Sequence, residues 1–388
     1  MNMYDFDKII RREQTACVKY DLREAYFGQG DVFPMWVADM DFETPVFIRD
    51  AIQERATHPI YGYSFRPETY FTSIMQWVDK RHNWQLKKNW ILFSPGVVPA
   101  LNMATLAFTD PGDGILVQPP VYFPFFHAVK NHKRNLIENQ LLYNEGRYTI
   151  DFTDFEQKVR KAKMFFLSNP HNPVGRLWTA EELKRMGDIC VKYDVIIISD
   201  EIHCDLALPG FRHIPMASLS DEIAQNTVTC IAPSKTFNVA GLATSSLIIA
   251  NKQLRHKMRR IIEDLHIGNG NLFGAAASIA AYENGEQWLD ELMQYIETNF
   301  RLLDGFLRNE LPVLELVHAE ATYLAWIDFR KTGLSDVKIK EKLLHEAKLG
   351  LSPGPVFGKG GEGFQRMNLA TQKANVEEAL DRLKLAFG

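Results

Sequence analysis

Short apolar runs, each ending at a proline or a polar residue, recur through the middle of the chain. They are rich in Val, Ile, Leu and Phe, and each is followed by a turn-forming residue such as Pro, Asp, Ser or Asn. Runs of this length and composition are typical of strands buried on both faces of a sheet. The runs are GILVQPP (114–120), KMFFLSNP (163–170), DVIIISDE (194–201), TVTCIAPSK (227–235) and SSLIIAN (245–251).

Segments with helical spacing separate several of these runs. The segment TAEELKRMGDICVKY (179–193) places apolar residues three and four positions apart, begins with the capping residue Thr179 and is acidic in its first turn. Strands that alternate with helices in this way predict a mostly parallel sheet covered by helices, which is an α/β fold.

The pattern changes near residue 286. A long amphipathic stretch, EQWLDELMQYIETNFRLLDGFLRNEL (286–311), precedes a strand-like run, TYLAWIDF (322–329), and a glycine-rich stretch, GPVFGKGGEGF (354–364). We therefore expect three parts: an N-terminal arm over 1–45, a large domain over 46–285 and a smaller α/β domain over 286–388. The glycine-rich stretch lacks the ending of a P-loop, so it is not expected to bind a nucleotide. We expect it to form a flap beside the functional site.

Composition narrows the function classes. The chain has 388 residues, 46% hydrophobic and 24% charged, with a formal net charge of −4. Its basic residues are scattered, so a nucleic-acid partner is not expected. No run approaches the roughly 18 apolar residues of a membrane span, and the charged N-terminus lacks the pattern of a signal peptide, so a cytoplasmic protein without a membrane partner is predicted.

Cysteines and clustered acids give little reason to expect a metal. The four cysteines lack C-x-x-C spacing and a histidine cluster, so neither a zinc site nor a disulfide framework is predicted. Cys204 is read as a small buried hydrophobe. The acidic residues Asp39, Asp41 and Glu43 have no histidine among them, and no metal is assigned to them.

Polar residues gather where the predicted strands end. Ligands of doubly wound sheets bind beyond the carboxyl ends of the strands, so these residues are expected to form one site. A lysine there is informative, because burial lowers the pKa of an amine and makes it a nucleophile. The residues in question are the turn SPGVV (94–98), Tyr122, Asn169, Asn172, Asp200, His203, Ser234 and Lys235.

These motifs resemble those of a known enzyme superfamily. NPHNPVG (169–175), followed by SDE (199–201) and SK (234–235), resembles the fold-type I enzymes that depend on pyridoxal 5′-phosphate, the aspartate-aminotransferase-like superfamily. More narrowly, the chain resembles the MalY/PatB group of cystathionine β-lyases, also called cysteine-S-conjugate β-lyases. The segments that carry this narrower resemblance are PMWVADMDF (34–42), YGYS (61–64), SDEIHCDL (199–206) and PSKTFNVAGL (233–242).

The resemblance implies a fold, a cofactor and an assembly. The expected fold has a large domain with a mostly parallel seven-stranded sheet in an α/β/α sandwich, and a smaller C-terminal α/β domain. Pyridoxal 5′-phosphate is the expected cofactor, and a homodimer with shared active sites is the expected assembly. The N-terminal arm would then pack on the small domain and on the dimer partner.

The resemblance also implies roles around the cofactor ring. Lys235 would bind the cofactor and later move the substrate α-proton. Asp200 would pair with the protonated ring nitrogen, where an ionised carboxylate stabilises the developing carbanion. Asn172 would donate to the ring oxygen, with His203 where many aminotransferases have a tyrosine, and Tyr122 would stack on the ring.

Phosphate and substrate contacts complete the implied site. The backbone amides of Gly96, Val97 and Val98 open a helix and would bind the phosphate, assisted by the Ser234 hydroxyl. Tyr63, or alternatively Tyr61, would reach the phosphate and substrate of the neighbouring subunit. Two residues would contact the substrate within one chain, Arg366 by clamping its carboxylate and Ala38, with Trp36 and Val37, by lining its pocket.

Two positions depart from related patterns. Ala243 stands where many aminotransferases have a phosphate-binding arginine, which is what the lyase group shows, and Ala232 stands where a serine is common. The main prediction is therefore a carbon–sulfur β-lyase that converts L-cystathionine or other S-substituted cysteines to a thiol, pyruvate and ammonia. A class I/II aminotransferase is the alternative. A regulatory protein is a third reading, although no feature marks a surface for such a partner.

Overall fold

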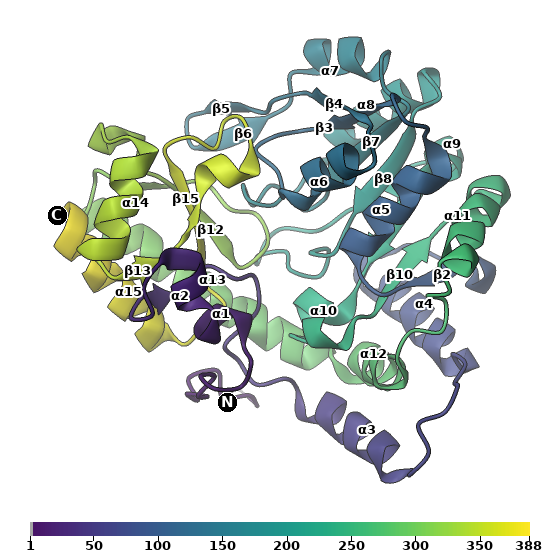
Figure 1. Ribbon diagram of the computed structural model, residues 1–388, viewed down its shortest axis with the longest axis horizontal. Coiled ribbons are helices and arrows are strands. Elements are labelled where there is room, and N and C mark those ends of the chain that lie inside the picture. Colours follow the sequence, from purple (N-terminus) through teal and green to yellow (C-terminus); the bar gives the residue numbers. More distant parts are fainter. Residues whose placement is uncertain (1–2) are drawn as a thin grey trace.

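A seven-stranded sheet dominates the computed structural model, which describes residues 3–388 (Figure 1). Strand β10 is antiparallel to both neighbours, and the remaining pairs are parallel. This arrangement confirms the predicted mostly parallel sheet of seven strands. In spatial order the strands are β2 (Ile91–Ser94), β10 (Ser245–Ile248), β9 (Thr227–Ile231), β8 (Ile196–Asp200), β7 (Met164–Ser168), β3 (Gly114–Val117) and β4 (Asn135–Glu138).

Alternate residues of each central strand belong to different cores. In β7, Met164 and Phe166 pack in one apolar cluster, whereas Phe165 and Leu167 pack in another. Successive side chains of a strand point to opposite faces, so a strand covered on both faces must be apolar throughout. This requirement explains why the sequence shows continuous apolar runs instead of alternation.

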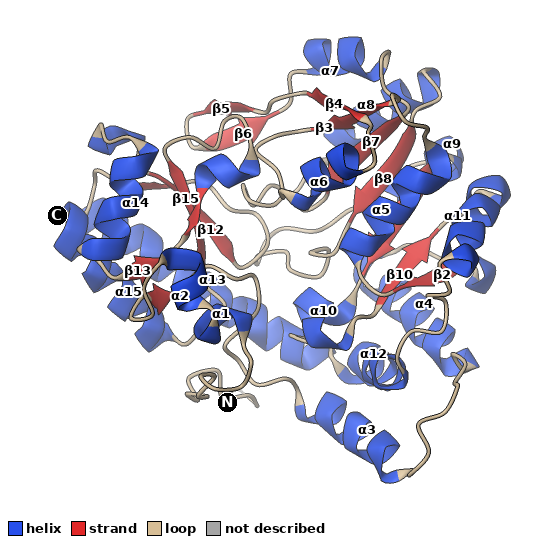
Figure 2. Ribbon diagram, in the orientation of Figure 1, coloured by secondary structure: helices blue, strands red, loops and turns tan. Residues whose placement is uncertain are grey.

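Helices cover both faces of this sheet (Figure 2). One cluster joins the strands to α5 (Val97–Phe108), α6 (Pro124–Asn131) and α11 (Lys252–Asp264). The opposite cluster joins them to α7 (Phe152–Val159), α8 (Ala180–Lys192) and α9 (Asp221–Gln225). Helix α8 begins as predicted: Thr179 and Glu182 form a reciprocal capping box.

A second sheet of four strands follows the long helix α13 (Glu286–Glu310). Its order is β11 (Glu315–Leu316), β12 (Leu324–Asp328), β15 (Phe364–Asn368) and β14 (Ser352–Pro353), and all its pairs are antiparallel. It is accompanied by α14 (Asp336–His345) and α15 (Lys373–Phe387). The third and largest apolar cluster joins α13 and α15 to α3 (Val46–Thr57), α4 (Glu68–His82) and α12 (Leu272–Asn284).

The N-terminal segment packs against the C-terminal part of the chain. Strand β1 (Phe33–Pro34) pairs in parallel with β13 (Leu349–Gly350), and the short helices α1 (Val18–Asp21) and α2 (Arg23–Phe27) precede it. In Figure 1 the purple N-terminal helices lie beside the yellow C-terminal elements. The hairpin of β5 (Leu142–Asn144) and β6 (Arg147–Thr149) completes the strands.

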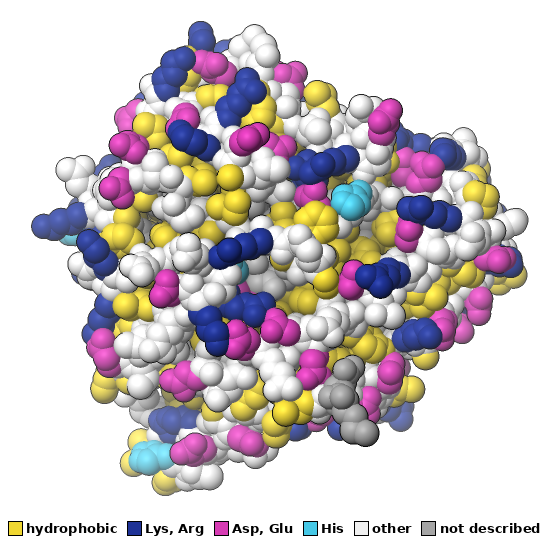
Figure 3. Space-filling model, turned by 180° about the vertical axis from the view of Figure 1, so that it is seen from behind, with side chains coloured by type: hydrophobic (Ala, Val, Ile, Leu, Met, Phe, Trp, Pro, Cys, Tyr) yellow, Lys and Arg dark blue, Asp and Glu magenta, His cyan; other side chains and the backbone are white. Residues whose placement is uncertain are grey.

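Charged side chains of both signs are interspersed over the face of the molecule seen in Figure 3. Among the described helices, none has the length and apolar character needed to cross a membrane.

Glu320, which lies just before β12, binds residues that follow β7 and a residue of β6. Its Oε2 accepts hydrogen bonds from Arg176 Nε at 3.0 Å and Leu177 N at 2.8 Å, and its Oε1 accepts one from Arg147 at 2.7 Å. Arg176 and Glu320 are both buried, whereas the Arg147 side chain is 47% exposed.

We predict that Glu320→Ala lowers the free energy of unfolding by about 3 kcal/mol, because it removes a partner from a buried guanidinium. The matched control, Arg147→Ala, should cost about 1 kcal/mol or less, because that pair is partly solvated. Urea denaturation followed by tryptophan fluorescence measures both. Equal effects of the two substitutions would contradict the importance of the buried pair.

Candidate active site

The polar ends of three neighbouring strands meet at one edge of the large sheet. Asp200 is the last residue of β8, Asn172 follows β7, and Lys235 lies in the short helix α10 (Pro233–Thr236) directly after β9. Because these strands are parallel, their carboxyl ends lie at the same edge. The structure thus brings together residues that are spread over 63 positions of the sequence, from Asn172 to Lys235.

Two adjoining cavities lie there. The inner cavity, of about 230 Å³, is lined by polar strand-end residues and by the start of α5. The outer cavity, of about 720 Å³, is lined by Arg366 and by mostly apolar residues. Ala38, Tyr122 and Lys235 line both. The predicted residues at the inner cavity are Ala38, Gly96, Val97, Val98, Tyr122, Asn172, Asp200, His203, Ser234 and Lys235.

The Lys235 amine lies at the junction of the two cavities. Its Nζ donates a hydrogen bond to the Ala38 carbonyl at 2.6 Å. Burial, assisted by the nearby Arg366 charge, lowers the pKa of Lys235 to about 8, although Asp39 and Asp200 act in the opposite direction. A substantial fraction of the amine is therefore neutral near physiological pH, as a nucleophile or a base requires.

Asp200 and His203 occupy the buried side of the inner cavity. Burial raises the pKa of Asp200 to about 7, and the neighbouring Glu201 adds to this effect. Such a carboxylate fits a cationic ligand atom, which would restore its charged form. Burial lowers the pKa of His203 to about 3, so the ring is neutral, and its Nδ1 has no hydrogen-bond partner among the described residues.

Arg366 is presented to the outer cavity by β15. Its guanidinium donates to Asn172 Oδ1 at 3.1 Å and to the Trp36 carbonyl at 3.0 Å, while its Nε has no hydrogen-bond partner in residues 3–388. Burial lowers the pKa of Arg366 to about 10. A buried guanidinium whose described partners are neutral fits a carboxylate ligand.

The start of α5 provides an anion-binding geometry in the inner cavity. Gly96 is the N-cap of this 12-residue helix, and Gly96, Val97 and Val98 line the cavity together with Ser234. Ala243 and Thr244 also line it, so a methyl group stands at the position of the absent arginine. Ala232 is buried in an apolar cluster and is not among the residues that line this cavity within the described chain.

Tyr63 lies away from both cavities. Its side chain is fully exposed in the single chain, and the Tyr61 hydroxyl donates to the Ala56 carbonyl. The two tyrosines border a surface groove with Gly241 and residues 269–273. Contact of Tyr63 with the site of a neighbouring subunit stays a prediction.

Sequence reasoning missed how the site is held. Residues 36–42, which we call the 36–42 segment, run past both cavities, and each of their carbonyl groups accepts a hydrogen bond from a side chain. The donors are Arg366 and Ser352 to Trp36, Asn368 to Val37 and Asp39, Lys235 and Tyr323 to Ala38, Arg12 and Asn238 to Met40, Gln372 to Asp41, and Asn238 to Phe42.

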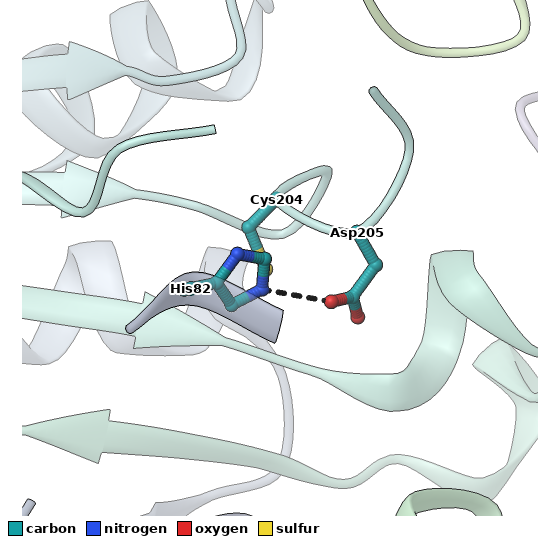
Figure 4. A group of neighbouring side chains, drawn as sticks. All are labelled: His82, Cys204 and Asp205. Atoms are coloured by element: carbon teal, nitrogen blue, oxygen red, sulfur yellow. Dashed lines mark hydrogen bonds and ion pairs between the residues drawn. The ribbon is translucent and has the colours of Figure 1, made fainter. Parts of the chain in front are cut away.

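A buried polar cluster lies behind the lysine. Figure 4 shows His82, Cys204 and Asp205, with His82 Nε2 at 2.9 Å from Asp205 Oδ1. Asp205 also accepts from Trp77 Nε1 at 3.0 Å and from Thr236 Oγ1 at 2.8 Å. Burial raises the pKa of Cys204, so it is a protonated thiol. Because Thr236 follows Lys235 in the chain, Asp205 helps to hold the lysine backbone in place.

Comparisons with known proteins identify the family of the chain. The chain belongs to the class I and II aminotransferase family, whose sequence pattern matches residues 31–383. This membership, together with the relatives below, confirms the resemblance described above and the fold-type I architecture.

Two kinds of relative are informative. The chain is 45% identical over 385 residues to cystathionine β-lyase PatB of Bacillus subtilis, covering 99% of this chain and all of the relative. It superimposes with a TM-score of 0.96 on cystalysin from Treponema denticola, which contains pyridoxal 5′-phosphate (37% identity; 99% and 98% coverage). It also superimposes with a TM-score of 0.92 on the PLP-bound C-S lyase from Staphylococcus hominis (34% identity; 99% and 98% coverage).

The lowered pKa of Lys235 gives a direct prediction. In cofactor-free protein, acylation of Lys235 should rise with pH through a midpoint near 8, because the amine reacts only when neutral. Exposed lysines, with pKa values of about 10.4, provide the internal control. Peptide mass spectrometry across a pH series measures both. A midpoint for Lys235 that coincides with that of the exposed lysines would contradict the effect of burial.

Proposed function

We propose that this protein is a pyridoxal-5′-phosphate-dependent carbon–sulfur β-lyase that cleaves L-cystathionine or other S-substituted cysteines. The observation that carries the proposal is the placement of Lys235 and Arg366 on adjoining cavities beside the buried Asp200. The activities named for the relatives in Bacillus subtilis and Staphylococcus hominis support the lyase reaction.

The charged groups that line the inner cavity, and its polar atoms that lack hydrogen-bond partners among the described residues, fit the cofactor. Asp200 would hold the cationic ring nitrogen, and Asn172 and His203 the ring oxygen, with Tyr122 against the ring. Gly96, Val97, Val98 and Ser234 would hold the phosphate, and Lys235 would bind the cofactor covalently. When bound, pyridoxal phosphate acts as an electron sink that stabilises negative charge on the substrate α-carbon.

The residues of the chain then divide the remaining tasks. Arg366 binds the substrate carboxylate in the outer cavity and thereby fixes the direction of the Cα–H bond. Lys235, released as a neutral amine, removes the proton from that carbon. The bond between Cβ and sulfur breaks with its electron pair remaining on sulfur, which takes a proton to give the thiol. Hydrolysis of the remaining three-carbon product gives pyruvate and ammonia.

Three organisational proposals accompany this function. The chain forms a homodimer in which Tyr63 of one subunit, exposed in the single chain, contacts the phosphate and substrate of the other. The N-terminal arm (1–45), the large domain (46–285) and the small domain (286–388) are its parts, and the arm contacts the dimer partner. The protein works in the cytoplasm.

The reaction predicts a specific product pattern. Purified holoenzyme given L-cystathionine without any 2-oxo acid should release homocysteine, pyruvate and ammonia in equal amounts over many turnovers, because elimination needs no amino-group acceptor. A thiol assay and a lactate-dehydrogenase-coupled assay measure the first two products. Transamination that requires a 2-oxo acid, with no thiol released from any S-substituted cysteine, would support the aminotransferase alternative.

The role of Arg366 predicts a binding defect. Arg366→Ala should raise KM about 10- to 100-fold, which corresponds to the roughly 1.5–3 kcal/mol of a hydrogen bond to a charged group. Arg366→Lys should recover part of the loss, since it keeps the charge but loses the two-pronged geometry. Steady-state kinetics, with the visible absorbance of bound cofactor as the control for an intact site, make the comparison. An unchanged KM in the alanine variant would place carboxylate binding elsewhere.

A further inference from the structure

The two aspartates of the 36–42 segment pair with basic residues of the N-terminal arm. The two carboxylate oxygens of Asp39 accept hydrogen bonds from the two terminal nitrogens of Arg12, at 3.1 and 2.6 Å. Asp41 accepts from Arg12 at 2.7 Å and from the Lys19 amine at 2.6 Å. Lys19 and Asp41 are buried, whereas the side chains of Arg12 and Asp39 are 19% and 22% exposed. The arm thus supplies two cations for the two carboxylates.

The two carboxylates depend on Arg12 to different degrees. Asp41 has a second cation, Lys19, within ion-pair distance. Asp39 pairs only with Arg12 among residues 3–388. Arg12 also donates to the Met40 carbonyl at 3.0 Å, so it holds both the side chain and the backbone of the segment. Loss of the Arg12 guanidinium would therefore leave Asp39 without a paired cation.

Asp39 lies beside the amine that the reaction uses. It directly follows Ala38, whose carbonyl accepts the Lys235 hydrogen bond at 2.6 Å. Burial lowers the pKa of Lys235 to about 8, and Asp39 is the strongest of the charges that act on it, in the opposite direction. The other titratable groups around this amine are Tyr122, Asp200, His203, Tyr323 and Arg366.

The sign of this effect makes the pairing of Asp39 important. A carboxylate near an amine favours the ammonium form, and a guanidinium bound to that carboxylate offsets its charge. An unpaired Asp39 would therefore protonate a larger share of Lys235 near neutral pH. An ammonium group can neither attack a carbonyl carbon nor accept a proton.

We propose that Arg12 is a positioning residue for the reaction: by binding Asp39 in a two-pronged contact, it offsets the negative charge beside Lys235 and keeps that amine neutral. Arg12 acts through Asp39 and the 36–42 segment, and it lines neither of the two cavities of the site. The proposal rests on the proposed function, which gives the Lys235 amine its task. It makes the N-terminal arm part of the catalytic apparatus of its own chain.

Cofactor-free protein tests the charge of the amine directly. Arg12→Ala should move the pH midpoint for acylation of Lys235 upward from about 8. We expect a shift of about 0.5–1 pH unit, less than the roughly 1–3 units caused by a charge within about 4–6 Å, because Arg12 acts from behind Asp39. Peptide mass spectrometry across a pH series measures the midpoint, and circular dichroism checks that the protein is folded.

Two single variants serve as matched controls. Arg11 is the neighbouring arginine, its side chain is 78% exposed, and its ion-pair partner is Glu13 at 3.8 Å. Arg11→Ala therefore removes the same charge without touching Asp39 and should leave the midpoint within about 0.2 pH unit. Arg12→Lys keeps a cation but loses the two-pronged contact, so its midpoint should lie between those of the wild type and Arg12→Ala.

A double variant separates charge from mere packing. In Arg12→Ala/Asp39→Asn both members of the pair are neutral, so the midpoint should return to within about 0.3 pH unit of the wild type. A purely structural role of Arg12 predicts no such return, because the asparagine does not restore the lost contact. Asp39→Asn alone should lower the midpoint, and this variant tests the charge effect even if Arg12→Ala fails to fold.

The loaded enzyme provides a second readout. In Arg12→Ala holoenzyme acting on L-cystathionine, the acidic limb of the kcat–pH profile should move to higher pH, because a larger share of the Lys235 amine is protonated. KM should change less than kcat, since Arg366, which would bind the substrate carboxylate, keeps its own contacts. Arg11→Ala should leave the profile in place.

The outcomes distinguish the role of Arg12 from the lyase reaction. If thiol is released but Arg12→Ala leaves the Lys235 midpoint unchanged, the lyase function stands and the proposal for Arg12 is overturned. A midpoint that rises in Arg12→Ala and stays raised in the double variant would also overturn it. If the midpoints shift as expected but no S-substituted cysteine releases a thiol, Arg12 controls the charge of Lys235 and the lyase function fails.

Discussion

The carbonyl oxygen of Ala38 joins the two halves of the site. It accepts one hydrogen bond from Lys235, which lies just after β9 of the large sheet. It accepts another, of 2.9 Å, from the hydroxyl of Tyr323, which lies just before β12 of the small sheet. The same principle applies along the 36–42 segment, because a buried carbonyl without a partner costs about 1–3 kcal/mol. Lys235 and Asn238, which lie after β9, and Arg366 and Asn368 of β15 donate to these carbonyls, so the segment fixes the four residues relative to one another.

Burial has a common electrostatic effect on this arrangement. The pKa values of Lys235, Asp200 and Arg366 move to about 8, 7 and 10, in each case towards the neutral form and with desolvation as the largest cause. Each group thus lacks part of the solvation or pairing that its charge would need. A cationic ring nitrogen beside Asp200 and a substrate carboxylate beside Arg366 would supply the opposite charges that these two groups lack. The site is therefore arranged for ligands whose charges complete it.

Local sequence patterns predicted most strands of the large sheet and the start of α8. The apolar runs of β3, β7, β8, β9 and β10 were recognisable because burial on both faces requires apolar residues at every position, and Thr179 marked the start of α8. Strands β2 and β4 were not recognised by pattern; β4 begins and ends with a polar residue and is partly exposed, so it lacks a continuous apolar run. The roles at the site came from motif resemblance, and the structure places those residues, with the exception of Tyr63, around the two cavities.

The residues that hold the site through contacts distant in sequence could not be recognised from the sequence around them. Tyr323 reads as one more aromatic residue in an apolar strand, and Asn238 and Asn368 read as turn residues, yet all three hold the 36–42 segment. The outer cavity also forms only where the N-terminal segment, residues 122–127, α14 and residues 349–366 meet. Such features depend on tertiary contacts between positions up to about 330 residues apart, which no window of sequence can contain.

The most direct test of the account is to locate the cofactor on the chain. Reduction of the holoenzyme with borohydride fixes the bound cofactor to the amine that holds it, and peptide mass spectrometry then identifies that amine. We expect a pyridoxyl group on Lys235 in nearly every chain. A pyridoxyl group on a different lysine, or none after full loading with pyridoxal phosphate, would contradict it.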